Sequence, residues 1–194
     1  MEKRELRKHF LELRSAVTER QERDAAICRH LRELECCRNA DALALYVSDG
    51  REPDLRDLFL WKRTFLPRYV EEMKKYELVG IENPETDLVP GKYDLLEPRP
   101  ELPAAPADYV QQHIVFVTPA VACTRRGVRL GRGGGFYDRM LELAGRDAVG
   151  VIYDCQLAEE LPAEPHDKPL DFIVTESGAW KCLSSENEMK KEKK

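Results

Sequence analysis

Apolar positions at helical spacing predict two helices near the start of the chain. Within residues 2–17, apolar side chains recur at intervals of four, three and four positions, which places them on one helix face. These side chains belong to Leu6, Phe10, Leu13 and Val17. Thr18 and Gln21 have the spacing of a capping box and predict the start of a second helix, which ends near residues 36–39. The apolar stripe of that helix comprises Ile27, Leu31 and Leu34.

Short apolar runs bounded by polar residues predict the strands of a sheet. The clearest run covers residues 114–117 and is ended by Pro119. The other predicted strands cover residues 42–47, 63–67, 76–81, 148–153 and 172–175, and helices are expected over residues 54–61 and 136–143. Because strands alternate with helical segments, we expect a three-layer α/β fold in which helices cover both faces of a mainly parallel sheet.

The remaining segments are less regular. Residues 83–107 carry many prolines and acids, and we expect them to form a long ordered loop or lid. A short turn or helix is expected at residues 156–160. The length of 194 residues fits one domain, which we place at residues 1–180, followed by a charged and disordered tail at 181–194.

Charge and cysteine usage narrow the class of protein. The net charge of −5, with both signs mixed along the chain, argues against a protein that binds nucleic acid through bulk charge. No apolar run approaches the roughly 18 residues of a membrane span, and the charged N-terminus lacks a signal-peptide core. The six cysteines form no CxxC pair, which indicates reduced thiols. We therefore expect a monomeric cytoplasmic protein whose partners include neither nucleic acid nor a membrane.

The most distinctive stretch is residues 129–139, which read Arg-Leu-Gly-Arg-Gly-Gly-Gly-Phe-Tyr-Asp-Arg. Glycines at a helix start expose backbone N–H groups that can cradle an anion, most often a phosphate. Arg129, Arg132 and Arg139 add charged donors, and Asp138 could hold a hydrated Mg²⁺ beside that phosphate. A flexible loop with ordinary helix punctuation is the alternative that composition alone leaves open.

Two better-known glycine patterns do not fit this stretch. A P-loop ends in Gly-Lys-Ser/Thr, which is missing here. A dinucleotide fingerprint has its glycines directly after a strand, whereas the last predicted strand ends twelve or more residues earlier.

Glu52 follows the predicted strand at 42–47, where open α/β sheets bind ligands, although it could equally be an acid at a helix start. Lys3 and Arg7 share a helix face, which by pattern alone indicates solvated surface.

Taken in order, these motifs resemble the 5-formyltetrahydrofolate cyclo-ligase family over most of residues 3–175. The most specific part is Pro119 followed by residues 127–139, which match Gly-x-Arg-Leu-Gly-x-Gly-x-Gly-aromatic-Tyr-Asp. Weaker matches in family order are Lys3, Arg7, Tyr46, Glu52, Pro67, Met73, Glu97, Pro98, Gln156, His166, Asp167 and Asp171. The resemblance implies a Rossmann-like, NagB/RpiA/CoA-transferase-like fold.

The resemblance also implies a reaction. ATP phosphorylates the formyl oxygen of 5-formyltetrahydrofolate, N10 of the folate attacks that carbon, and 5,10-methenyltetrahydrofolate forms with ADP and phosphate as the other products. Mg²⁺ is the implied metal ion and ATP the implied co-substrate. Phosphoryl transfer needs in-line positioning and charge neutralisation, which glycine N–H groups, arginines, Lys3 and Mg²⁺ can supply.

The resemblance assigns roles residue by residue. ATP binding is implied for Lys3, Arg4, Arg7, Arg129, Leu130, Gly131, Arg132, Gly133, Gly134, Gly135, Phe136 and Tyr137. The implied catalytic residues are Arg132, Tyr137 and Asp138, and the implied Mg²⁺ ligands are Asp138 and Asp167. Folate binding is implied for Val47, Glu52, Pro67, Met73 and Tyr93. Plain core packing remains the alternative for Pro67, Met73 and Tyr93, and a turn acid or first-turn helix acid the alternative for the two aspartates.

Three departures from the family pattern motivate a second hypothesis. Phe136 stands where a tyrosine is common, Cys123-Thr124 replaces Phe-Asp, and Asp94 replaces a glycine. A non-catalytic folate- or nucleotide-binding module on the same fold would tolerate such changes, and another small-molecule kinase is a third possibility. Retention of both Asp138 and Asp167 favours the enzyme, because a mere binding module has less need of two metal carboxylates.

Overall fold

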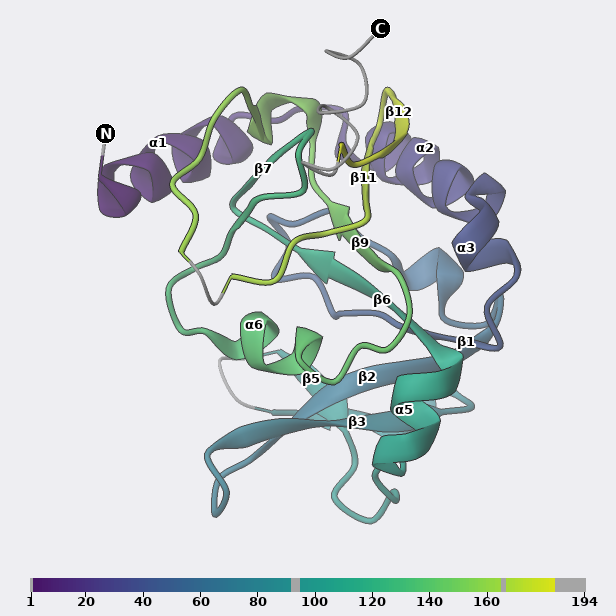
Figure 1. The fold of residues 1–194 in the computed structure, drawn as a ribbon. Helices are drawn as coiled ribbons and strands as arrows, with labels where there is room; N and C mark the ends of the chain where they lie inside the picture. The colour runs from purple at the N-terminus through teal and green to yellow at the C-terminus, as the bar shows by residue number, and fades with distance from the viewer. Residues whose placement is uncertain (1, 92–94, 165–166, 184–194) are drawn as a thin grey trace, which may run out of the picture.

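A seven-stranded sheet forms the centre of the protein in a computed structural model, which describes residues 2–91, 95–164 and 167–183 (Figure 1). The strand order is β12-β11-β9-β6-β1-β2-β3. The strands are β1 (Ala42–Ala44), β2 (Arg63–Val70), β3 (Lys75–Ile81), β6 (Ile114–Pro119), β9 (Ala148–Val151), β11 (Phe172–Thr175) and β12 (Gly178–Lys181). From β11 to β2 the neighbouring strands run parallel, and the edge strands β12 and β3 are antiparallel to their neighbours. The predicted mainly parallel sheet is confirmed.

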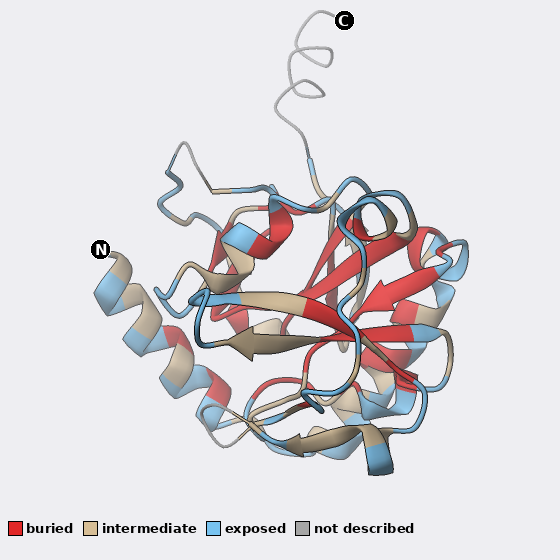
Figure 2. Cartoon of the chain, turned by 90° about the horizontal axis from the view of Figure 1, so that it is seen from below, coloured by how far each residue is buried: buried red, intermediate tan, exposed pale blue. Residues whose placement is uncertain are grey.

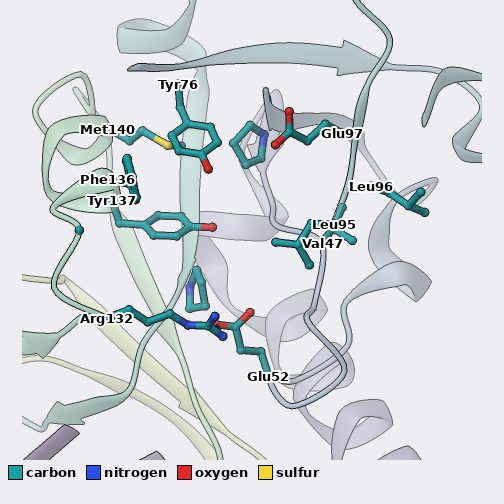
Figure 3. A pocket seen from close by; sticks show the side chains of 13 residues that line it. Val47, Glu52, Tyr76, Leu95, Leu96, Glu97, Arg132, Phe136, Tyr137 and Met140 are labelled. Carbon is teal, nitrogen blue, oxygen red and sulfur yellow. Dashed lines mark hydrogen bonds and ion pairs between the residues drawn. The ribbon is translucent and has the colours of Figure 1, made fainter. Parts of the chain in front are cut away.

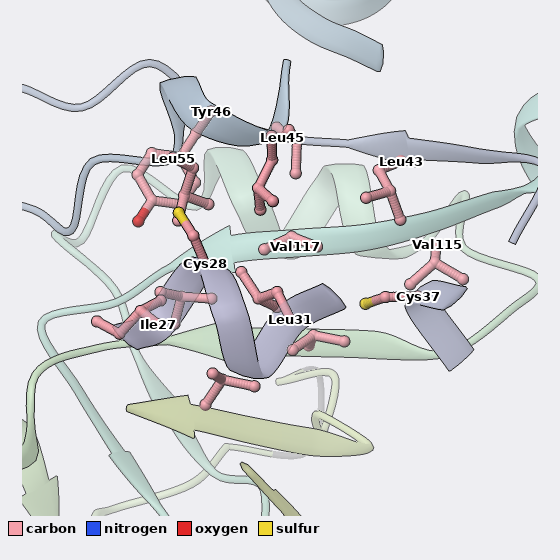
Figure 4. Packing of buried hydrophobic residues seen from close by; sticks show 14 of the residues in the cluster. Ile27, Cys28, Leu31, Cys37, Leu43, Leu45, Tyr46, Leu55, Val115 and Val117 are labelled. Carbon is pink, nitrogen blue, oxygen red and sulfur yellow. The ribbon is translucent and has the colours of Figure 1, made fainter. Parts of the chain in front are cut away.

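Helices cover both faces of this sheet, which confirms the three-layer prediction. Ile27 and Leu31 of α2 (Arg20–Glu33) and Cys37 of α3 (Glu35–Arg38) pack on one face against β1, β6 and β9 (Figure 4). Val110 of α5 (Ala107–His113) and Met140 of α6 (Phe136–Leu141) pack on the other face. Figure 2 shows burial concentrated in the central strands.

Strand β1 shows why the sheet needs both helical layers. Leu43 and Leu45 belong to the cluster that packs on α2, whereas Ala42 and Ala44 belong to the cluster that packs on α5 and α6. Successive side chains of a strand point to opposite faces, so an apolar run without alternation buries both faces. The apolar run that predicted β1 is therefore the pattern of a central strand.

Smaller elements surround the main sheet. A three-stranded sheet contains β7 (Ala122–Thr124), β8 (Arg129–Leu130) and β10 (Leu157–Ala158), and a two-stranded hairpin joins β4 (Leu88–Pro90) to β5 (Leu96–Pro98). The hairpin follows α4 (Pro84–Asp87), so the segment expected to be one irregular loop contains regular structure. Two single 3₁₀ turns also occur among the described residues, η1 (Arg56–Leu58) and η3 (Asp154–Gln156). The helix predicted over residues 54–61 is thus wrong, because only the turn η1 forms there.

Helix α1 (Lys3–Ser15) packs on the core largely through the predicted face, since Leu6, Phe10 and, just beyond the helix, Val17 contact core clusters. Phe10 packs against Val121 and Leu130, but Leu13 is 37% exposed, whereas Arg14 is 1% exposed. The buried positions 10 and 14 are four residues apart, so a charged residue continues the apolar stripe. The predicted capping box of the next helix is wrong, because Glu19 with φ 53° occupies the N-cap of α2. No helix among residues 2–91, 95–164 and 167–183 is long and apolar enough to cross a membrane.

Candidate active site

The segment after β1 directs Glu52 towards the carboxyl end of the sheet. The side chain of Asp49 accepts hydrogen bonds from the backbone N–H groups of Arg51 and Glu52 at 2.9 and 3.0 Å. Ser48 Oγ donates to the carbonyl oxygen of Glu52 at 2.7 Å. These bonds fix a tight turn, because Asp and Ser side chains readily mimic backbone turns. The turn leaves Glu52 only 9% exposed.

Glu52 and Asp49 receive two guanidinium groups from distant parts of the chain. Arg132 of the glycine stretch donates to Oε1 of Glu52 at 2.9 Å and also to Asp49. Arg14 of α1 lies 3.5 Å from Oε1 of Glu52 and 3.7 Å from Oδ2 of Asp49. Burial raises the pKa of Glu52 above its ordinary value, although Arg132 and Arg14 both oppose that rise. Burial also raises the pKa of Asp49, but the hydrogen bonds from Arg132 and the turn outweigh it and leave that pKa lowered.

The glycine stretch forms a loop between β8 and α6 that lies against α1. Gly133 and Gly135 have φ of 97° and 64°, which a residue with a Cβ rarely adopts. Arg7 Nε donates to the carbonyl oxygen of Gly131 at 2.8 Å, and a Cβ on Gly133 would lie 3.3 Å from Arg7 Cζ. The glycines therefore let α1 approach the loop closely. The loop directly follows β8, although the sequence showed no strand there, because a two-residue strand has no readable pattern.

Asp138 stands in the first turn of α6 and pairs with a buried arginine. Its Oδ1 accepts a hydrogen bond from Arg129 Nη2 at 2.5 Å. Arg129 is 8% exposed, and its Nη1 reaches the carbonyl oxygen of Pro119 at 3.4 Å. The adjacent Tyr137 has a pKa raised well above its ordinary value by burial, so its hydroxyl stays protonated and able to donate near neutral pH.

Lys3 binds the carboxylates of a segment near the other end of the chain. Its Nζ lies 3.0 Å from Glu164 and 3.3 Å from Asp167. Burial lowers the pKa of Lys3, but the two carboxylates raise it more, so the net shift is upward. The two predicted metal ligands thus each face a cation, Arg129 beside Asp138 and Lys3 beside Asp167. Among the described residues, no group of three or more His, Cys, Asp or Glu could hold a metal ion.

An apolar cavity of about 250 Å³ opens beside Glu52, Arg132 and Tyr137 (Figure 3). Glu52 and Arg132 point towards each other at one end, and Tyr76 lies near Glu97 at the other. The lining also includes Val47, Pro67, Leu95, Leu96, Pro119, Gly134, Phe136, Tyr137 and Met140. A smaller cavity of about 90 Å³ lies under the glycine loop and shares Glu52, Arg132 and Tyr137 with the first. The two cavities are therefore adjacent, one apolar and one lined by the loop.

Tyr76 and Phe136 line one side of the larger cavity, and Tyr69 packs behind Tyr76. The ring of Tyr76 meets the rings of Tyr69 and Phe136 edge to face, with centroids 5.1 Å away in both cases. The guanidinium of Arg139 lies over the ring of Phe136, 5.1 Å from its centroid. Phe136 thus serves as an aromatic wall, which requires no hydroxyl group. The departure of Phe136 from the family pattern leaves this packing intact.

The structure brings together most of the predicted residues. Val47, Glu52, Pro67, Arg132, Gly134, Phe136 and Tyr137 line the larger cavity, and Arg129, Gly131, Gly133, Gly135 and Asp138 line the smaller one. Met73 is not among the residues that line either cavity; it is 51% exposed in the turn between β2 and β3. Arg4 is exposed on α1 beside a shallow groove, and Tyr93, Asp94 and His166 lie outside the described residues.

Sequence reasoning missed three residues of the site. Arg14 has the spacing of four from Phe10 that continues the buried stripe, but spacing alone does not identify it, because an arginine on a helix normally faces water. Tyr76 lay inside a predicted strand, but nothing in a strand pattern tells which face meets a cavity. Glu97 matched a family motif without an assigned role, and its carboxylate accepts the backbone N–H of Tyr69 at 3.1 Å.

Comparisons with known proteins show which family the chain belongs to. The family model described as the 5-formyltetrahydrofolate cyclo-ligase family matches residues 1–176. The chain is 36% identical to 5-formyltetrahydrofolate cyclo-ligase of Escherichia coli K12 over 154 residues, which cover 73% of this chain and 81% of that protein. It is 32% identical to the Haemophilus influenzae protein of the same name over 187 residues, with coverage of 89% and 97%.

A solved structure is similar along nearly the whole chain. The NMR structure of Aquifex aeolicus 5,10-methenyltetrahydrofolate synthetase superposes with a TM-score of 0.81, at 29% identity and 95% coverage of both chains. The match of the family model, the two bacterial relatives and this fold point the same way as the glycine loop and its neighbouring cavity. The chain belongs to the 5-formyltetrahydrofolate cyclo-ligase family.

Proposed function

We propose that the protein converts 5-formyltetrahydrofolate to 5,10-methenyltetrahydrofolate in a reaction driven by ATP, with release of ADP and phosphate. One observation carries the proposal: an apolar cavity with a buried carboxylate adjoins a glycine loop lined by arginines, and Arg132 belongs to both. Such a pair of sites suits the transfer of a phosphoryl group from a nucleotide to a substrate that has apolar ring faces and hydrogen-bonding edges.

The larger cavity suits the folate. A pterin is a flat ring with polar edges, and the rings of Tyr76 and Phe136 with Val47 and Pro67 offer apolar walls of matching character. The carboxylate of Glu52 can accept two N–H donors from the pterin edge, which is a strong and directional interaction when buried. Met73 lies in an exposed turn, so its proposed contact with folate would need that turn to move over the cavity.

The glycine loop suits the phosphates of ATP. Backbone N–H groups at Gly133 to Gly135 can approach phosphate oxygens because no Cβ intervenes. Arg7 already lies against this loop, and Lys3 extends the same helix face by one turn. These cations would neutralise the phosphates and hold the γ-phosphoryl group in line with the formyl oxygen.

The reaction then proceeds in two steps. The formyl oxygen attacks the γ-phosphorus, the bond to ADP breaks, and a phosphorylated formyl group results. N10 attacks the formyl carbon, loses its proton, and expels phosphate to leave the methenyl bridge. Arg132 would turn from Glu52 towards the transferred phosphoryl group, and the protonated hydroxyl of Tyr137 would donate a hydrogen bond to the formyl or phosphoryl oxygen.

We propose that two carboxylates, each of which now pairs with a cation, would hold the Mg²⁺ that arrives with ATP. Mg²⁺ is usually bound by one or two carboxylates together with phosphate oxygens and water. Asp138 and Asp167 would supply those carboxylates, and the described residues hold no larger cluster that would bind a resident metal ion. The ion would add positive charge beside the transferred phosphoryl group. We also propose a monomeric cytoplasmic protein without nucleic-acid or membrane partners. The net charge of −5 supports the part of this proposal that concerns nucleic acid.

The test mixes purified protein with 5-formyltetrahydrofolate and Mg-ATP and follows the absorbance of the methenyl product. Controls omit ATP or Mg²⁺. We expect a signal only when all components are present. Folate that binds in a separate titration without any product would overturn the enzymatic proposal and favour the non-catalytic binding module.

A further inference from the structure

Arg14, in the last turn of α1, is buried although its neighbours Leu13 and Ser15 on the helix are exposed. Among the described residues, neither Nε nor Nη1 of Arg14 has a hydrogen-bond partner. Its two ion-pair distances, 3.5 Å to Glu52 and 3.7 Å to Asp49, are long. A buried guanidinium with unfilled donors costs free energy, so packing alone does not explain why this position carries a charge.

The position of Arg14 relative to the cavity suggests its role. Glu52 and Arg132 line the cavity, whereas Arg14 lines neither of the two cavities and reaches the same carboxylates from the α1 side. The carboxylates of Glu52 and Asp49 are thus shared between one guanidinium that belongs to the site and one that does not. Arg132 sits on an exposed glycine loop with its side chain 52% exposed, whereas Arg14 is fixed in the core.

We propose that Arg14 is a positioning residue for the folate: it holds Glu52 in place and ionised, so that Arg132 can leave Glu52 for the phosphates while the carboxylate accepts the substrate. This inference rests on the proposed function. A bidentate pterin would need both carboxylate oxygens of Glu52, and Oε1 already accepts the hydrogen bond from Arg132, so the two compete for that atom. Arg14 supplies the counter-charge that remains when Arg132 turns away.

Electrostatics gives the reason why a second arginine is needed. Two neighbouring carboxylates disfavour each other's ionisation, and burial adds to the effect at Glu52. With Arg132 turned away and no cation behind them, the pair would take up a proton. A protonated Glu52 could accept less and would itself need an acceptor, so it would fit the N–H donors of a pterin poorly.

The test measures the dissociation constant of 5-formyltetrahydrofolate without ATP, and the KM for each substrate, in Arg14→Met. We expect folate binding about tenfold weaker, a loss of about 1.4 kcal/mol, with the KM for ATP changed less than about twofold. Arg14→Lys keeps the charge and should recover most of the loss. Arg14→Gln is uncharged too and replaces the methionine variant if that variant does not fold. Arg23→Met is the matched control, because Arg23 pairs with Glu176 and lines neither cavity.

A double-mutant cycle separates positioning from plain stability. If Arg14 acts through Glu52, Arg14→Met should weaken folate binding little further in a Glu52→Gln background, whereas independent effects would add. Full additivity, or equal losses of folate affinity in Arg14→Met and in the Arg23 control, would refute the proposed role of Arg14 and leave the proposed reaction untouched. Wild-type protein that binds folate but makes no product would refute the proposed reaction, and the binding cycle would still judge Arg14. Wild-type protein that binds no folate would refute both.

Discussion

Asp138 has one observed role and one proposed role, and substitutions can measure them apart. It is the charge partner of the buried Arg129, and it is a proposed ligand of Mg²⁺. Asp138→Ala removes both functions. Asp138→Asn removes the charge but keeps an amide oxygen that can still accept the hydrogen bond from Arg129. The two variants should therefore differ in stability and agree in turnover.

The expected magnitudes follow from burial. Removing one partner of a fully buried ion pair costs about 3–5 kcal/mol. The side chain of Asp138 keeps 30% exposure, so water screens part of the interaction and we expect about 2 kcal/mol for the alanine variant. In a chain of this size that lowers Tm by about 4–8 °C. The asparagine variant should lose about 1 kcal/mol, or about 2–4 °C.

Turnover should fall by about 10²–10³ in both variants, because each loses a charge that acts on the phosphoryl-transfer state. Folate affinity should change by less than about threefold, since Asp138 does not line the larger cavity. Thermal melting, single-turnover kinetics and folate titration measure the three quantities. Glu142→Ala serves as control, because Glu142 is an exposed acid at the end of the same helix. Near-normal turnover in Asp138→Asn, or equal losses of turnover and folate affinity, would refute the metal role.

Other substitutions test the two sides of the site. Lys3→Ala should raise the KM for ATP about fivefold with Tm unchanged within about 2 °C. An unchanged KM would show that Lys3 is a surface residue that does not bind ATP. Glu52→Gln should weaken folate binding by about tenfold or more while ATP affinity stays, and the reverse pattern would contradict the pocket assignment. In the wild type, folate affinity should fall as pH drops through the pKa of Glu52, which burial raises above 4.5, and Glu52→Gln should lose that pH dependence. Gly133→Ala should raise the KM for ATP and lower Tm by a few degrees, because φ is 97° and the new Cβ would press on Arg7; unchanged values would show that the loop relaxes freely.

Much of the fold was predictable because its signals are local. The apolar runs that became β1, β6, β9 and β11 bury both faces, so their sequences alone identified central strands. The two-residue strands β8 and β10 are too short to carry a pattern, and they form by pairing with β7 and by packing in a small apolar cluster. The predicted helix at 54–61 failed because Pro53 and the apolar residues there pack in the core around one 3₁₀ turn. Tertiary packing decided that segment, and propensity could not reveal it.

The site was predictable in its composition but less so in its connections. The glycine loop and Glu52 stood out as motifs, and the structure adds that Arg132 joins them. Arg14 was hidden because an arginine within an amphipathic helix normally faces water, and only the position of two carboxylates from another segment makes its burial possible. Contacts between residues far apart in sequence are what a single sequence leaves undetermined.

The contacts of α1 also bear on the order in which the protein acquires its site during synthesis. A ribosome makes the N-terminal helix first, yet Arg7 reaches its loop partner 124 residues later in the chain, and Lys3 reaches Asp167 after 164 residues. At synthesis rates of about 5–20 residues per second, α1 waits roughly 6 to 33 seconds before those partners exist. The basic helix therefore lacks these partners on the nascent chain until most of the sheet has been made, so the phosphate side of the site is among the last parts of the protein to form.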